Sequence, residues 1–484
     1  MKKIFVIVFV IVIGFTQWSS LASATTILET FGDHNSINPL GNKIFSSGAG
    51  AVYSNPSLLL NQKKSFTIGI VNYYNGLNIS YLPKGSQYNV PESIFDSIPI
   101  NNQNPVYRPL PTSLLRNKRG SNKNEVYSQY LSLGTVIPFA KGNVVFGFQA
   151  VLPLKAFQVQ SPFYVDEREQ YFSNSLHYEL FEDRMQASVI SFALAGKMNS
   201  WLHVGAGLTM SQTAMTTTEL YMPDASEQEV SYLNSNIEIT TSFIPHFAAA
   251  LILSKQALLT ATVHLSGESR TEGVSDIQFY NYQNQEGDEK TLQKFTMVYG
   301  WQPLRAALAG SYKFGSKGSS LTLGGTLMYY KWSDYVDRHG EKPVNPWQDT
   351  FSAVLSVQCE MGETNLGFDA QFVPTPVPVQ EGRSNYVDNN RLAFSLGVSH
   401  PFTWHGLEMA AGISAQFHYM LSRSHAKNPD DPNPVIDEFV DSKNIFSDEY
   451  MPESGGFQTN NPGYPGFSSE GWMTLFSLWL KIAL

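Results

Sequence analysis

Apolar residues and small polar residues alternate along most of the chain. In the segment that starts at 202 the even positions are apolar, and the odd positions carry His, Gly, Thr and Ser. The segments that start at 259 and 409 alternate in the same way. Because successive side chains of a strand point to opposite faces of its sheet, the pattern predicts β-strands with one apolar and one small, polar face.

The connections between these segments alternate between short and long. Short turns are expected at 140–143, 199–200, 254–256, 315–318, 362–364 and 403–406, and the longer polar connections include 221–232 and 271–290. Bacterial outer-membrane barrels alternate short turns with long loops and have an even number of strands. A soluble sandwich does not require this alternation. We therefore expect an all-β fold, a transmembrane antiparallel β-barrel of about 14 strands.

The ends of the segments support a membrane barrel. The last segment, 472–484, alternates to the end of the chain, and such a strand would close the barrel and remove an open edge. Aromatic residues gather where segments meet connections, which predicts two girdles at the membrane surfaces, with ordinary core packing as the alternative. Those beside short turns are Phe139, Trp201, Phe314, Phe402 and Trp404, and those toward long connections are Tyr73, Tyr74, Trp301, Tyr329, Tyr330, Trp332 and Tyr335.

The first residues predict export. Met1-Lys2-Lys3 is a short positive region, Ile4 to Phe15 is apolar, and Ala22-Ser23-Ala24 has the small-x-small pattern of a cleavage site. We expect residues 1–24 to be a signal peptide. A retained membrane helix is the alternative, but the apolar run is shorter than the ~18 residues that a spanning helix needs.

Composition limits the possible partners. Charged residues make up 15% of the chain, against roughly 25% in soluble domains. The net charge of −9 argues against nucleic acid, since phosphate binding needs clustered Lys and Arg. The count of 1 Cys excludes an internal disulfide and multi-Cys zinc motifs. Gly-x-Ser-x-Gly, His-Glu-x-x-His and Walker motifs do not occur, so we expect neither an enzyme nor a cofactor or metal.

Residues 25–64 precede the predicted barrel and alternate only weakly. They are rich in small residues, with Gly48-Ala49-Gly50-Ala51 followed by Asn55-Pro56-Ser57-Leu58. The lumen of a barrel of about 14 strands is too wide for side chains alone to fill. We expect residues 25–64 to form a hatch, or plug, inside the lumen and residues 65–484 to form the barrel.

The run from Gly48 to Leu58 resembles the N-terminal hatch of the outer-membrane long-chain fatty-acid transporter family (the FadL family). That hatch carries a small-residue run followed by Asn-Pro-Ala-Gly-Leu. Here Asn55 and Pro56 match the motif, and Ser57-Leu58 stand in place of Ala-Gly.

Two later stretches resemble the same family. Residues 329–335 are similar to its aromatic-x-Trp-Ser-x-aromatic strand. Residues 374–378, followed by 388–397, resemble its Pro-Val-Pro loop leading into Asp-x-x-Arg and a Ser-x-Gly strand. The terminal Leu484 departs from the family's usual terminal aromatic residue. In order and placement the resemblance spans essentially the whole mature chain.

The resemblance implies transport of long-chain fatty acids or other hydrophobic small molecules through the outer membrane of a Gram-negative bacterium. Uptake would proceed by capture on the outer loops, transfer to a site in the barrel, hatch movement and lateral exit into the bilayer. A hydrophilic porin or surface-binding barrel stays open as an alternative, and an outer-membrane hydrolase is more distant. The expected partners are a hydrophobic ligand and membrane lipid, and we expect a monomer.

Inward residues that depart from the small, polar pattern are candidate ligand contacts. Tyr130, Met328, Tyr330 and Trp479 could line an apolar tunnel, with packing against the hatch as the alternative. Arg305 and Arg391 are candidates for an acid headgroup through charge-assisted pairing. The alternative for both arginines is an ion pair with an acidic residue of the hatch or lumen, namely Glu29, Asp33, Glu360 or Asp369.

A kink in the third strand is the lateral gate of the FadL family. The third predicted strand here is Val144 to Phe157, and it contains Pro153. Proline cannot donate to the ladder of a sheet, so Pro153 is the candidate gate residue. A strand end at the rim of the barrel would tolerate proline equally well.

Overall fold

The computed structural model describes residues 26–81, 125–154, 188–212, 229–239, 242–281, 291–316, 318–337, 340–343, 345–381, 386–427 and 466–484. The predicted signal peptide, 1–24, lies outside the described residues. Among the residues described, no helix is long and apolar enough to cross a membrane.

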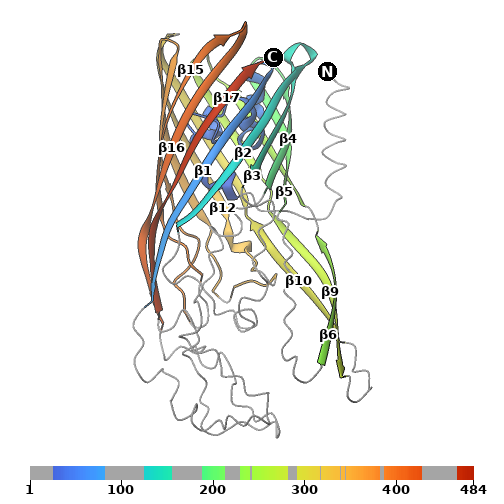
Figure 1. Cartoon of the computed structure of the whole chain (residues 1–484). Helices are drawn as coiled ribbons and strands as arrows, with labels where there is room; N and C mark the ends of the chain where they lie inside the picture. Colours follow the sequence, from blue (N-terminus) through green and yellow to red (C-terminus); the bar gives the residue numbers. More distant parts are fainter. Residues whose placement is uncertain are drawn as a thin grey trace.

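Fourteen antiparallel strands close into a barrel, which confirms the predicted fold (Figure 1). The first and last strands pair with each other from Ser65–Ala483 to Tyr81–Phe467, so the terminal segment closes the cylinder as expected. The barrel strands are β1 (Ser65–Tyr81), β2 (Glu125–Phe139), β3 (Val144–Pro153), β4 (Ser188–Lys197), β5 (Leu202–Gln212), β7 (Ser242–Ile252), β8 (Ala257–His264), β11 (Leu304–Ser316), β12 (Ser319–Lys331), β13 (Thr350–Met361), β14 (Thr364–Val373), β15 (Arg391–Trp404), β16 (Leu407–Ala426) and β17 (Gly466–Ala483).

Each predicted short turn connects two neighbouring strands at the same end of the barrel. The first contains a 3-10 turn, η4 (Ala140–Gly142), between β2 and β3. Gly362 and Gly406 have φ of 65° and 81°, a conformation that glycine adopts without a steric penalty. The strand order therefore follows the alternating short and long connections.

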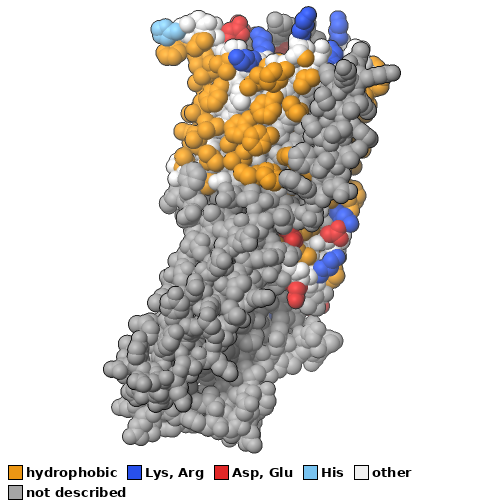
Figure 2. All heavy atoms as spheres, turned by 90° about the vertical axis from the view of Figure 1, so that its right-hand side faces the viewer, with side chains coloured by type: hydrophobic (Ala, Val, Ile, Leu, Met, Phe, Trp, Pro, Cys, Tyr) orange, Lys and Arg blue, Asp and Glu red, His pale blue; other side chains and the backbone are white. Residues whose placement is uncertain are grey.

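The outward face of the barrel is an apolar belt. Leu308, Leu355 and Leu396 are 62%, 70% and 64% exposed, whereas the inward Thr260 and Thr262 are buried. Figure 2 shows hydrophobic side chains over the barrel and charged side chains at its short-turn end. A belt of this kind is the surface that a membrane-spanning barrel presents to lipid. The aromatic residues predicted beside the short turns are exposed, which confirms the girdle at this end: Phe139, Trp201, Phe314, Phe402 and Trp404.

The second predicted girdle is wrong for several of its members. Trp301, Trp332 and Tyr335 are buried, and they pack with Trp347 and Tyr386 in a cluster that we call the outer aromatic cluster. Trp332 lies in η7 (Trp332–Asp334), directly after β12. The connections after β12 and β14 pack against each other, so these rings face one another instead of lipid. Tyr73 is also fully buried.

Three further strands form a separate sheet with the order β10-β9-β6. They are β6 (Glu229–Ile239), β9 (Gly267–Asn281) and β10 (Thr291–Gln302), and they project beyond the barrel at the end opposite the short turns (Figure 1). The prediction of 221–232 and 271–290 as strand-free connections is therefore wrong in part. Leu265 and Ser266 separate β8 from β9, and Pro303, which has no N–H, separates β10 from β11.

Residues 26–61, which we call the N-terminal segment, fold as short helices inside the barrel (Figure 1). These are α2 (Thr26–Phe31), α3 (Asn42–Phe45), η1 (Gly48–Gly50), α4 (Ala51–Ser54) and η2 (Pro56–Asn61). Polar contacts join the segment to strands around the barrel. They run from Asn35 Nδ2 to Ser132 Oγ of β2 (2.7 Å), from Asn38 Nδ2 to Asp369 Oδ1 of β14 (3.0 Å), from Thr260 Oγ1 of β8 to Lys43 O (3.0 Å), and from Gln416 Nε2 of β16 to Phe31 O (2.9 Å).

Glycines on the inward face bring the wall against the backbone of the N-terminal segment. A Cβ on Gly205 of β5 would lie 2.6 Å from the backbone nitrogen of Ser57, and one on Gly397 of β15 would lie 2.5 Å from Ile37 Cα. Real Cβ atoms do not approach backbone so closely, so a larger residue at either position would force the segment away from the wall.

Candidate functional site

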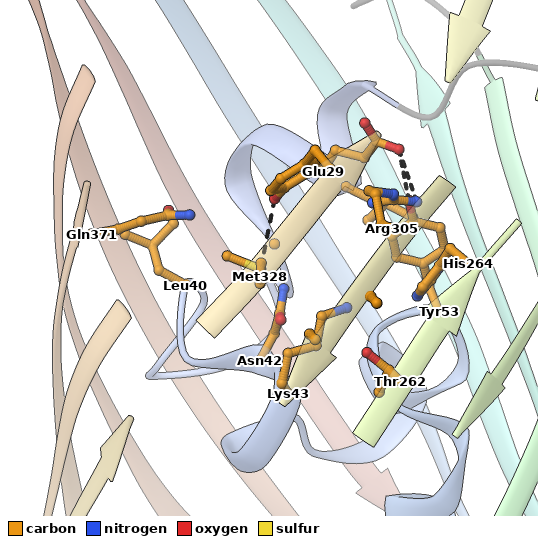
Figure 3. A pocket seen from close by; sticks show the side chains of 15 residues that line it. Glu29, Leu40, Asn42, Lys43, Tyr53, Thr262, His264, Arg305, Met328 and Gln371 are labelled. Atoms are coloured by element: carbon orange, nitrogen blue, oxygen red, sulfur yellow. Dashed lines mark hydrogen bonds and ion pairs between the residues drawn. The ribbon is translucent and has the colours of Figure 1, made fainter. Parts of the chain in front are cut away.

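A small cavity lies between the N-terminal segment and the wall (Figure 3). Its volume is about 30 Å³, enough for about two water molecules and far below the ~300–1,000 Å³ of ligand pockets. This cavity, as it stands, is therefore too small to hold a hydrocarbon chain. The lining consists of Leu28, Glu29, Gly32, Leu40, Asn42, Lys43 and Tyr53 from the N-terminal segment and Thr262, His264, Arg305, Ala306, Ala307, Met328, Tyr330 and Gln371 from the wall.

An ion pair between Arg305 and Glu29 lies at the centre of this site (Figure 3). Arg305 Nη2 is 2.8 Å from Glu29 Oε1, and the two side chains are 9% and 16% exposed. The same Nη2 donates to the hydroxyl of Tyr53 at 2.8 Å, and that hydroxyl donates to Glu29 Oε1 at 3.4 Å. This is the pairing that the sequence raised as the alternative for Arg305. Removing one partner of such a buried pair costs about 3–5 kcal/mol.

Two histidines support the site from the wall. His246 of β7 and His264 of β8 are cross-strand neighbours, and their rings stack with centroids 4.9 Å apart. His246 Nε2 lies 2.8 Å from the carbonyl oxygen of Val52 and donates to it. His264 packs edge-on against Tyr53, is buried, and has no hydrogen-bond partner for either ring nitrogen among the described residues. Its nitrogens are therefore available to a molecule that enters the cavity.

Lys43 adds a second positive charge. Its Nζ donates to the carbonyl oxygen of Ser54 at 2.9 Å. Burial and, to a smaller extent, nearby Arg305 lower the pKa of Lys43 to about 7, while Glu29 opposes the shift. No salt bridge to Lys43 occurs in the described part of the chain.

The structure brings three of the predicted ligand contacts together. Arg305, Met328 and Tyr330 all line the cavity. The hydroxyl of Tyr330 lies 3.6 Å from Met328 Sδ and interacts electrostatically with both Arg305 and Arg391. Arg391 also interacts with Asp388, in the connection just before β15.

Tyr130 and Trp479 lie elsewhere in the lumen. Tyr130 is fully buried in an apolar cluster with Ile27 and Phe31 of the N-terminal segment. Trp479 is buried opposite Gly412 and Gly69, its neighbours on β16 and β1. The predicted contacts are therefore spread along the barrel rather than gathered at one point.

The hatch motif forms a compact turn. Asn55 is buried, and its Nδ2 donates to Lys43 O at 2.7 Å, while Ser57 Oγ donates to Asn55 Oδ1 at 2.6 Å. Pro56 begins η2, a position where its missing N–H carries no cost. This turn joins α4 to η2 and rests on Gly205 of the wall.

Pro153 is the last residue of β3 and pairs with Tyr130 of β2. On its other side, the ladder between β3 and β4 ends at Val151 and Val189. The structure thus places Pro153 at a strand end, and its role as a gate stays a prediction.

Sequence reasoning did not identify Lys43, Tyr53 or His264 as cavity residues. Tyr53 directly precedes Ser54-Asn55-Pro56 and so belongs to the stretch that resembles a hatch. Nothing in the sequence indicated that its side chain lines a cavity. Lys43 and His264 carry no such signal. Among the residues that the structure describes, no group of three His, Cys, Asp or Glu side chains is placed to hold a metal ion.

Searches with family models and against curated proteins found no match for the chain. Among solved structures it is similar to the CymD monoaromatic hydrocarbon channel, with 10% identity, 93% of this chain and 98% of that chain covered, and a TM-score of 0.46. It is also similar to the P. putida toluene transporter TodX, with 10% identity, coverage of 96% and 99%, and a TM-score of 0.45. Identities and TM-scores this low assign neither family nor function to the chain.

Proposed function

We propose that the protein carries hydrophobic small molecules, long-chain fatty acids among them, through the outer membrane of a Gram-negative bacterium, with the N-terminal segment acting as its hatch. The observation that carries the proposal is the segment packed inside the barrel, beside a cavity of only about 30 Å³. A porin for water-soluble solutes needs an open lumen. Cargo that partitions into lipid can instead be passed through a barrel that stays closed to water and ions.

Arg305 and Arg391 are the residues proposed to bind an acid headgroup, and Tyr130, Met328, Tyr330 and Trp479 to contact the chain. Arg305 supports this role because it shares the cavity with Met328 and Tyr330. Tyr330 also packs against both the outer aromatic cluster and an apolar cluster of Leu40, Ala307, Met328, Val354 and Ala393. These contacts form a continuous line of apolar packing from the outer connections to the cavity, and this is the path proposed for apolar cargo.

Lateral exit at Pro153 is proposed as the last step. Among the described residues the ladder between β3 and β4 ends at Val151, and Pro153 supplies no N–H to extend it, which favours this place for an opening in the wall. Pro153→Ala is expected to slow uptake, while Pro401→Ala on the exposed end of β15 should not. Unchanged uptake in the Pro153 variant would remove this residue from the route.

The function is tested by uptake of a radiolabelled long-chain fatty acid in a Gram-negative host that lacks its own fatty-acid transporter. Expression is expected to raise fatty-acid uptake without raising the uptake of a sugar, and mass spectrometry of the purified protein should identify a bound acyl chain. A large, steady ion conductance in planar bilayers, with no gain in fatty-acid uptake, would favour a hydrophilic porin instead.

A further inference from the structure

Glu29 occupies the place at Arg305 that an acidic cargo needs. Its carboxylate lies 2.8 Å from the Arg305 guanidinium, and the Tyr53 hydroxyl bonds to both groups. With a volume of about 30 Å³, the cavity beside them has no room for a second carboxylate with its chain. A cargo carboxylate that takes over the bonds of Arg305 Nη2 must therefore replace Glu29.

The charges in the cavity favour that exchange. The lining carries two basic residues, Arg305 and Lys43, and one acidic residue, Glu29. An entering carboxylate that takes the place of Glu29 keeps Arg305 paired with an anion throughout, which avoids the large cost of an unpaired buried charge. A neutral headgroup offers Arg305 no such replacement.

Glu29 also joins the N-terminal segment to the wall. It is the single charged residue of α2, whose sequence is TILETF. The rest of α2 is held by apolar packing of Ile27, Leu28 and Phe31, and by the bond from Gln416 to the carbonyl of Phe31. Apolar packing and a neutral hydrogen bond do not distinguish cargo by charge, but the ion pair does.

We propose that Glu29 is an internal substitute for acidic cargo. The carboxylate of an amphipathic monocarboxylic acid replaces Glu29 on Arg305, and this exchange releases α2 from β11 so that the N-terminal segment can move. The inference rests on the proposed function and adds a selection rule to it. An acid is carried in preference to an alcohol of the same chain length, because only the acid competes with Glu29.

The test compares uptake of a long-chain acid and the matching alcohol by wild type and by Glu29→Gln, which keeps the side-chain shape and removes the charge. Wild type should favour the acid by at least about tenfold, within the usual range of coupling between sites. In Glu29→Gln the ratio should fall toward one. Glu360→Gln is the matched control, since it breaks the 2.8 Å ion pair with Lys313 outside the cavity lining, and it should keep the wild-type ratio.

Release of α2 is measured without transport. Leu28→Cys, made in a Cys359→Ala background, places a thiol on a buried position of α2, and its rate of maleimide labelling is followed in lipid nanodiscs. The acid should accelerate labelling and the alcohol should not, and adding Glu29→Gln should give fast labelling without cargo. Glu29→Gln combined with Arg305→Gln removes both charges, and in that protein the acid should change the labelling rate no more than the alcohol does.

The outcomes separate the two proposals. If wild type carries the acid and Glu29→Gln keeps the acid-to-alcohol ratio, the exchange is wrong and the transport function stands. Acceleration of labelling by the acid but not by the alcohol in the protein that lacks both charges would also overturn the exchange. If wild type carries neither compound, the transport function fails and the exchange fails with it.

Discussion

The N-terminal segment and the outer aromatic cluster are held by different forces. Directional polar contacts join the N-terminal segment to the wall, such as Asn38 to Asp369 and Glu29 to Arg305. In the outer aromatic cluster the rings of Tyr335 and Trp347 stack with centroids 3.7 Å apart. Tyr386 meets both rings edge-on.

This difference bears on what each region can recognise. The hydrophobic effect that buries these rings is non-directional and favours any apolar molecule of suitable size, so it discriminates poorly between hydrocarbons. A buried polar contact yields only to a group that replaces its charge or hydrogen bonds. We infer that the outer aromatic cluster admits apolar molecules as a class and that the contacts of the N-terminal segment select among headgroups.

The two regions are connected through neighbouring residues of one connection. The side chain of Tyr386 belongs to the outer aromatic cluster, and that of Val387 packs in the cluster that contains Ile27 and Phe31 of α2. A displacement of the rings therefore reaches the N-terminal segment directly.

The largest expected effect comes from breaking the polar anchor at Asp369. This carboxylate accepts hydrogen bonds from Asn38 Nδ2, Leu40 N and Ser395 Oγ. Asp369→Ala leaves buried donors unpaired at about 1–3 kcal/mol each. We expect a lower free energy of unfolding in urea and a leak of ions in planar bilayers, with the exposed Glu363→Ala as control. If the Asp369→Ala protein leaks no ions and unfolds with the wild-type free energy, apolar packing alone holds the N-terminal segment.

A smaller effect is expected in the outer aromatic cluster. Trp347→Leu removes the stacking with Tyr335 and leaves a partly filled space, at a cost of about 2 kcal/mol. Fatty-acid uptake should change for acid and alcohol alike, because ring packing does not sense the headgroup. A change in the acid-to-alcohol ratio in this variant would contradict the division between the two regions.

An effect on stability of similar size, but without a change in the lumen-facing rings, is expected at the wall beneath Asn55-Pro56-Ser57. Gly205→Ala places a methyl group 2.6 Å from the backbone of Pro56 and Ser57, and overpacking of this kind costs about 1–3 kcal/mol. Gly325→Ala on β12 is the matched control, because no atom lies within 4 Å of its Cβ position. The two variants should differ in urea unfolding, and equal midpoints would show that the segment does not rest on β5.

Alternation predicted the barrel because one face of each strand meets lipid and the other meets the lumen. On β8 the outward Leu259 and Val263 are exposed while the inward Thr260 and Thr262 are buried, as the sequence indicated. The sheet formed by β6, β9 and β10 was missed because β6 and β9 overlap the predicted connections 221–232 and 271–290, and β10 follows the second of them directly. The aromatic residues near long connections were misassigned because a ring at a strand end can face lipid or a folded connection, and periodicity does not distinguish the two.

The sequence allowed contacts in the site to be predicted only between residues of opposite charge. The pair of Arg305 with Glu29 could be considered because opposite charges in a charge-poor chain have few partners. Lys43 could not be placed, since its Nζ is bonded to the carbonyl of Ser54 and its own carbonyl accepts from Asn55 and Thr260. Every residue has a backbone carbonyl, so the sequence does not indicate which carbonyl accepts a hydrogen bond. The fold of the N-terminal segment was needed to find these contacts.

The central claim is that the N-terminal segment must move for cargo to pass, and a reversible crosslink tests it most directly. A Cβ on Gly41 would lie 3.0 Å from Ser356 Cβ of β13, slightly below the ~3.5–4.5 Å of disulfides. In a Cys359→Ala background, Gly41→Cys with Ser356→Cys is compared with each single variant. The oxidised double variant should lose fatty-acid uptake and regain it on reduction. Uptake at the wild-type rate with the crosslink fully formed would contradict the account.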